Sequence, residues 1–148
     1  MNPLWKKMQI KDQSTILVLG APSEFEAILS DRDPSWQVTT GGAIEPVEDA
    51  QFDVVIMFLT DETDVAHAAE VIKANVDGDD TLLWMCYPKK SSKKYAATIS
   101  RDTGWDPVID LGWEGVRQVA VDSDWSALRF RPRDAIKSYT RKKKIGKS

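Results

Sequence analysis

The chain has 148 residues, a formal net charge of −3 at pH 7, one cysteine and one histidine. Its length suits one domain with its own core, and a hydrophobic fraction of 42% excludes a disordered chain. A lone cysteine, Cys86, excludes an internal disulfide framework, suits a reducing cytosol, and leaves too few ligands for a histidine–cysteine metal site.

The hydropathy pattern indicates neither secretion nor insertion into a membrane. The first twelve residues, MNPLWKKMQIKD, are basic but lack the apolar core of a secretion signal. No stretch approaches the roughly 20 apolar residues that span a bilayer. We therefore expect a soluble, cytoplasmic protein that has no membrane partner.

Apolar runs and turn signals predict the elements in chain order. Strands are expected at residues 14–20, 36–39, 52–60 and 81–87, and a hairpin with a three-residue loop is expected over 116–121 and 125–130. Helices are expected at residues 24–29, 62–76, 92–102 and 106–111, and the composition of 135–144 is compatible with another. Ser23, followed three residues later by Glu26, is a capping-box pattern for the first helix, and Asp61 can cap the second.

This alternation predicts an α/β protein consisting of a single three-layer Rossmann-like sandwich. Its sheet would be mostly parallel, with a C-terminal antiparallel β-hairpin at one edge. We divide the chain into an N-terminal arm (1–12), a Rossmann-like domain (13–133) and a basic C-terminal tail (134–148). Residues 129–148 contain nine Lys or Arg and one acid, so this end carries about +8 and leaves about −11 on the rest.

The carboxyl ends of the parallel strands are the expected place for a ligand. After the first strand, the loop GAPSEF has one glycine, Gly20, and a proline without an N–H. Neither this loop nor the end of the next strand, which lacks an acid for a ribose, fits a conventional NAD site. The loop suits an S-adenosylmethionine site little better, and helix capping explains it.

A lysine-rich turn after the 81–87 strand is the better candidate. Its lysines, hydroxyls and backbone N–H groups could hold a phosphate or another anion, although a solvated turn capped by Ser91 or Ser92 is the simpler interpretation. Arg101 and Arg117 could join this pocket or pair with nearby acids. The candidate ligand-binding residues are Gly20, Ser23, Asp61, Tyr87, Lys89, Lys90, Ser91, Ser92, Arg101 and Arg117.

The acids after the 52–60 strand favour a structural role. Asp61, Glu62 and Asp64 could bind Mg²⁺ or act as a base, but no nucleophile or histidine is visibly paired with them. Carboxylates at this place also stabilise a helix N-terminus. We therefore assign no catalytic residue, metal site or cofactor.

Several stretches resemble a known family. LLWMCYPKKSS, ISRDTGWDPV and VRQVAVDSDWSALRFRPR resemble an uncharacterised bacterial family of small α/β proteins, classed only as a domain of unknown function. The resemblance covers roughly residues 15–133 and is most specific in the hairpin. It implies a compact Rossmann-like body but transfers no activity and no catalytic residue. More distantly, the strand order with a terminal hairpin is similar to the methyltransferase version of the fold, and fold does not imply function.

Three hypotheses for function follow. The favoured one is a non-catalytic module that binds a small anionic or nucleotide-type ligand, a protein partner or a second copy of itself. The alternative is an enzyme that binds a nucleotide-type ligand, most plausibly S-adenosylmethionine, as methyltransferases do. The third is a nucleic-acid accessory protein that uses the basic tail, for which the candidate contacts are Arg141, Lys142, Lys143 and Lys144.

Overall fold

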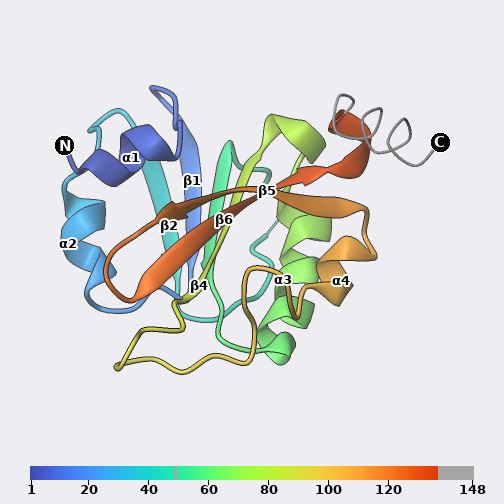
Figure 1. The fold of residues 1–148 in the computed structure, drawn as a ribbon. Coiled ribbons are helices and arrows are strands. Elements are labelled where there is room, and N and C mark those ends of the chain that lie inside the picture. The colour runs from blue at the N-terminus through green and yellow to red at the C-terminus, as the bar shows by residue number, and fades with distance from the viewer. Residues whose placement is uncertain (49, 137–148) are drawn as a thin grey trace.

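One six-stranded sheet organises the chain, with the strand order β2-β1-β3-β4-β6-β5 (Figure 1). The computed structural model describes residues 1–48 and 50–136. The strands are β1 (Thr15–Leu19), β2 (Gln37–Gly41), β3 (Val54–Phe58), β4 (Leu82–Pro88), β5 (Trp113–Ala120) and β6 (Trp125–Pro132). The helices are α1 (Pro3–Lys7), α2 (Phe25–Ser30), α3 (Glu62–Asn75) and α4 (Asp106–Ile109), with 3-10 turns at Gly78–Asp80 and Arg133–Ala135.

The sheet is mostly parallel. Strands β1 to β4 pair in parallel, whereas β6 pairs antiparallel with both β4 and β5. This arrangement confirms the predicted α/β sandwich with its C-terminal antiparallel hairpin. The hairpin connection spans residues 121–124, so it is one residue longer than the predicted loop.

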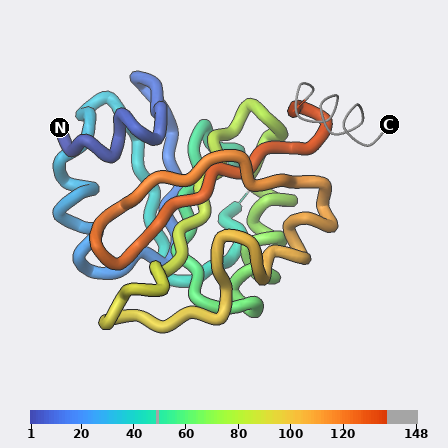
Figure 2. Tube along the Cα trace, viewed as in Figure 1, coloured from blue at the N-terminus to red at the C-terminus, as the bar shows by residue number. Residues whose placement is uncertain are grey.

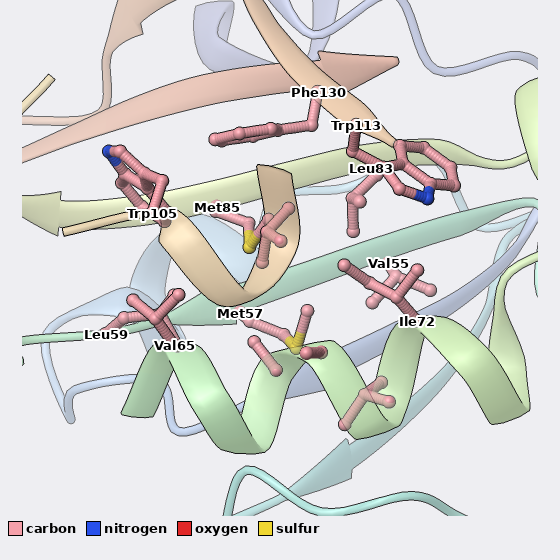
Figure 3. Packing of buried hydrophobic residues seen from close by; sticks show 14 of the residues in the cluster. Val55, Met57, Leu59, Val65, Ile72, Leu83, Met85, Trp105, Trp113 and Phe130 are labelled. Atoms are coloured by element: carbon pink, nitrogen blue, oxygen red, sulfur yellow. The ribbon is translucent and has the colours of Figure 1, made fainter. Parts of the chain in front are cut away.

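Helices cover both faces of the sheet, α1 and α2 on one side and α3 and α4 on the other (Figures 1 and 2). The central strands β1, β3 and β4 are almost entirely buried, because each carries apolar side chains toward both layers. Figure 3 shows the α3 side of this core, where Val65 and Ile72 of α3 face Met57, Leu83 and other strand residues. On the opposite side, Leu4 and Trp5 of α1 are buried against the sheet.

The connection from β2 to β3, described for residues 42–48 and 50–53, is irregular and is anchored to α3 by one buried side chain. Asn75 is 0% exposed. Its Oδ1 accepts a hydrogen bond from the Val47 N–H at 3.0 Å, and its Nδ2 donates to the carbonyls of Val47 at 3.0 Å and Ala50 at 2.7 Å. This anchor holds the segment that carries Ile44 against the last residue of α3.

Two local predictions need correction, and a third is not tested. The predicted helix at 92–102 does not form, because Ser92 Oγ accepts the N–H groups of Lys94 and Tyr95 in a turn and later residues bond to other elements. Ser23 makes no side-chain cap, and α2 begins after Glu24. From residue 137 onward, the predicted 135–144 helix lies outside the described residues. None of the described helices is long and apolar enough to cross a membrane.

Candidate functional site

A cavity of about 410 Å³ opens where the parallel strands end. Its walls come from the loop after β1, the turn after β2, the end of β3 and two aromatic residues from distant segments. We call it the carboxyl-edge cavity, and it is lined by Gly20, Pro22, Gly42, Ala43, Ile44, Phe58, Thr60, Asp64, Tyr95 and Trp125. The structure thus places a cavity at the edge that the strand pattern indicated.

Gly20 ends β1 in a conformation that suits glycine. Its φ is +72°, in the left-handed region, and its N–H donates to the Gly41 carbonyl at 2.9 Å. A Cβ at this position would lie 2.8 Å from Ile44 Cδ1 and 3.1 Å from the Phe58 carbonyl oxygen. The bare backbone therefore lets the chain pass close to β3, and Ile44 closes over it from the side.

Two aromatic rings form one wall. Tyr95 and Trp125 lie with ring centroids 5.0 Å apart and planes tilted by 54°, and Phe58 packs edge-on against Trp125 at 5.1 Å. Trp125 is 3% exposed, and its buried indole Nε1 has no acceptor among the described residues. A buried donor of this kind is destabilising unless something accepts its hydrogen bond. The wall is thus aromatic, and behind it Trp125 carries a buried donor that no described residue satisfies.

Side-chain contacts attach the loop after β4 to Glu24, just before α2. Tyr95 Oη donates to Glu24 Oε1, and Lys94 Nζ forms an ion pair with Glu24 Oε2 at 3.3 Å. The hydrogen bond from Tyr95 lowers the pKa of Glu24, and the same bond raises the pKa of Tyr95. Farther along, the Thr98 N–H donates to the Thr60 carbonyl at 3.0 Å. These contacts hold Tyr95 against the cavity.

The acids after β3 accept hydrogen bonds from other residues of the protein. Asp61 Oδ1 accepts the Asp64 N–H at 2.8 Å, which confirms the predicted helix cap. Asp64 Oδ2 accepts from the Thr60 N–H at 2.9 Å and the Thr60 hydroxyl at 3.2 Å, and Glu62 accepts from the Thr98 hydroxyl. Of these acids only Asp64 lines the cavity.

The charge of the cavity wall differs from the sequence prediction. Asp64 is its one carboxylate, and no Lys, Arg, His or Cys is among the described residues that line it. A phosphate placed here would meet a negative charge and no positive one. The wall therefore disfavours an anionic ligand and favours a neutral or cationic one.

The predicted lysine-rich turn lies outside this cavity. Lys90 and Ser91 are exposed, and the Lys89 N–H donates to the Asp124 carbonyl at 2.8 Å. Ser92 Oγ donates to Asp124 Oδ1 at 2.8 Å, so this hydroxyl ties the turn to the hairpin. The turn capped by Ser92 is the interpretation that the geometry supports.

The other predicted residues are spread over the molecule. Tyr87 is 5% exposed and packs edge-on against Trp105 at 6.0 Å, away from the cavity, and burial raises its pKa. Ser23 and Asp61 do not line the cavity, whereas Gly20 does. Arg101 and Arg117 line a different cavity together. The tail residues Arg141, Lys142, Lys143 and Lys144 lie outside the described residues.

Sequence reasoning missed Ile44, Tyr95 and Trp125. They are far apart in the chain and meet only through the fold, so no local spacing links them. The small residues Gly42 and Ala43, directly after β2, were the one local signal of open space at that strand end.

Comparisons with known proteins agree on the fold. No family model and no curated protein matches the chain. Among solved structures, an S-adenosylmethionine (SAM)-dependent methyltransferase from Aquifex aeolicus is similar, with a TM-score of 0.64, 13% identity and 86% of each chain covered. A tRNA methyltransferase from B. subtilis has a TM-score of 0.53 and 12% identity over 91% of this chain and 68% of that one.

A third similar structure contains a ligand. It is the complex of a protein named DhpI with S-adenosylhomocysteine (SAH), with a TM-score of 0.50 and 14% identity over 80% of this chain and 76% of that one. At these identities the likeness shows the Rossmann-like fold alone and does not bear on activity.

Proposed function

We propose that the protein binds a nucleoside-type ligand without phosphate groups, with SAM or SAH as the first candidates, in the carboxyl-edge cavity. The observation that carries this proposal is the composition of the wall: aromatic and aliphatic side chains, one carboxylate and no cation. SAM bears a sulfonium cation and no phosphate, so it suits this wall better than ATP or NAD does. The cavity volume of about 410 Å³ lies within the usual range for small-molecule sites.

The residues present fit such a ligand in part. Phe58, Tyr95 and Trp125 offer apolar and aromatic surface for a planar base. Asp64 retains one carboxylate oxygen without a described partner, which could accept from a ribose hydroxyl or an ammonium group. The loop after β1 departs from a glycine-rich loop, since Pro22 removes a backbone donor.

Of the two hypotheses, we favour a binding module over an enzyme. Methyl transfer would need a substrate site beside the ligand and a group that removes a proton, and we assign neither. We also propose that the protein is cytoplasmic and that it belongs to the uncharacterised bacterial family.

An NMR titration of isotope-labelled protein tests it, with SAM, SAH, adenosine, ATP, NAD and inorganic phosphate added separately. We expect saturable shifts at Gly20, Gly42, Ala43 and the Trp125 indole with the first three compounds. ATP, NAD and phosphate should shift these signals less. Absence of shifts with SAM, SAH and adenosine at millimolar concentration would overturn the proposal.

Two variants locate the ligand. Ala43→Trp places a large side chain in the cavity and should abolish the shifts, while Gln51→Trp, an exposed position outside the cavity wall, should leave them. Trp125→Phe leaves a smaller ring in the wall and should weaken binding about fivefold, because apolar contact is lost. Equal binding by the Ala43 and Gln51 variants would place the ligand elsewhere.

A further inference from the structure

A second cavity, of about 290 Å³, lies on the α3–α4 side of the sheet. The 99–105 loop, α4 and the β5–β6 hairpin surround it, and it shares no lining residue with the carboxyl-edge cavity. We call it the hairpin cavity. Arg101 comes from the loop and Arg117 from β5, so two segments of the chain each contribute a cation to its wall, which also contains the carboxylates of Asp102 and Glu114.

The two arginines lack partners of opposite charge. The side chains of Arg101 and Arg117 form no hydrogen bond or ion pair with a described residue. Guanidinium groups bind carboxylates through paired N–H donors, and such charge-assisted bonds are stronger than neutral ones. Both arginines are exposed, so their guanidinium groups are accessible to the carboxylate of a ligand.

The same wall contains an acceptor without a donor. Glu114 Oε2 is buried and accepts no hydrogen bond from the described residues. Arg133 Nε lies 3.7 Å from it, close enough for an ion pair but too far for a hydrogen bond. Glu114 and Asp102 place negative charge in the same wall as the two arginines, so a ligand that carries a cation as well as an anion suits this cavity better than a plain anion.

The inner wall is apolar. Trp105 and Phe130 are 3% and 1% exposed and lie with ring centroids 5.0 Å apart, and Figure 3 shows both on the same side of the sheet. Trp105 Nε1 already donates to the Ser100 carbonyl at 2.7 Å, so its polar atom is used. This wall offers contact for an apolar group.

We propose that the hairpin cavity binds a free α-amino acid with an apolar side chain. The carboxylate would bind Arg101 and Arg117, the ammonium group would donate to Glu114, and the side chain would pack toward Trp105. An anion site alone would leave the Glu114 acceptor unused, and an apolar pocket alone would leave two guanidinium groups unused. A small zwitterion satisfies both sets of atoms.

Titrations of the labelled full chain with L-phenylalanine, L-leucine and L-methionine test this. At least one should give saturable shifts at Arg101, Arg117 and the Trp105 indole, with the signals of Gly20 and Gly42 unmoved. Phenylalaninamide, which lacks the carboxylate, and 3-phenylpropionate, which lacks the ammonium group, should each bind about tenfold more weakly than phenylalanine.

Arg117→Gln and Arg101→Gln should each weaken binding about tenfold, whereas Lys90→Gln removes one exposed charge outside the cavity and should change nothing. No shifts with any of the three amino acids would overturn the proposal. So would equal binding of 3-phenylpropionate or inorganic phosphate, which would indicate a plain anion site, or unchanged binding in both arginine variants. Because SAM shifts are expected only at the other cavity, the two proposals fail independently.

Discussion

Gly20→Ala tests the close packing that shapes the carboxyl-edge cavity. An alanine at φ +72° costs about 1–2 kcal/mol, because a left-handed conformation brings Cβ close to the backbone. The new Cβ would also lie 2.8 Å from Ile44 Cδ1 and 3.1 Å from the Phe58 carbonyl oxygen, and overpacking of this kind costs about 1–3 kcal/mol. Lower entropy of the unfolded chain returns about 0.4–1 kcal/mol.

We therefore expect Gly20→Ala to lower the free energy of unfolding by about 3 kcal/mol and the melting temperature by about 10 °C. Urea denaturation followed by tryptophan fluorescence measures the loss. Gly42→Ala is the matched control, since a Cβ there meets no atom within 4 Å and should cost under about 1 kcal/mol.

A double-mutant cycle separates the two causes. Ile44→Val removes the Cδ1 methyl, so it should relieve about 1 kcal/mol of the Gly20→Ala cost and leave the conformational part and the Phe58 contact. Equal stability of the Gly20 and Gly42 variants, or strict additivity with Ile44→Val, would refute the packing argument.

Three other changes probe the surroundings of the site. Asn75→Ala removes three hydrogen bonds that anchor segment 42–53 and should cost about 2–3 kcal/mol in urea denaturation, against a negligible effect of Lys73→Ala on the exposed side of α3. Glu24 has a lowered pKa because Tyr95 donates to its charged form, so its contribution to stability is present above the unfolded pKa and disappears as pH falls through the folded one. The difference in free energy of unfolding between wild type and Glu24→Gln should therefore vanish in acid. A difference that stays constant with pH would contradict the hydrogen bond from Tyr95 to the Glu24 carboxylate. Burial raises the pKa of the Cys86 thiol, so iodoacetamide should modify Cys86 only after unfolding, and rapid labelling of native protein would contradict its burial.

The sheet was predictable because its central strands are apolar on both faces. Runs such as FDVVIMFLT and TLLWMCY contain no alternation, and only a strand covered by helices on both sides explains them. The hairpin was visible from its alternation and turn residues. Helix α3 was predictable because Asp61 caps it and its apolar residues share one face.

The 92–102 region failed because distant partners outweigh its local helical pattern. The Ser92 hydroxyl reaches Asp124 on the hairpin, and Tyr95 reaches Glu24 before α2. Asn75 was equally invisible, since its partners lie in an irregular segment 25–28 residues earlier. Such contacts depend on tertiary structure, and no window of local sequence contains both sides of them.

A cavity lies at the edge where the sequence predicted a ligand, but its wall does not carry the predicted positive charge. Lysines near a strand end suggested an anion, because a sequence shows which residues are near in the chain but not where their side chains go. Lys94 pairs with Glu24, and the residues that face the cavity are apolar or acidic. Lys94, next in the chain to the cavity residue Tyr95, thus fastens the loop that carries Tyr95. Lys94→Gln should therefore loosen the Tyr95 wall and change the cavity signals in NMR spectra, whereas Lys90→Gln should leave them in place.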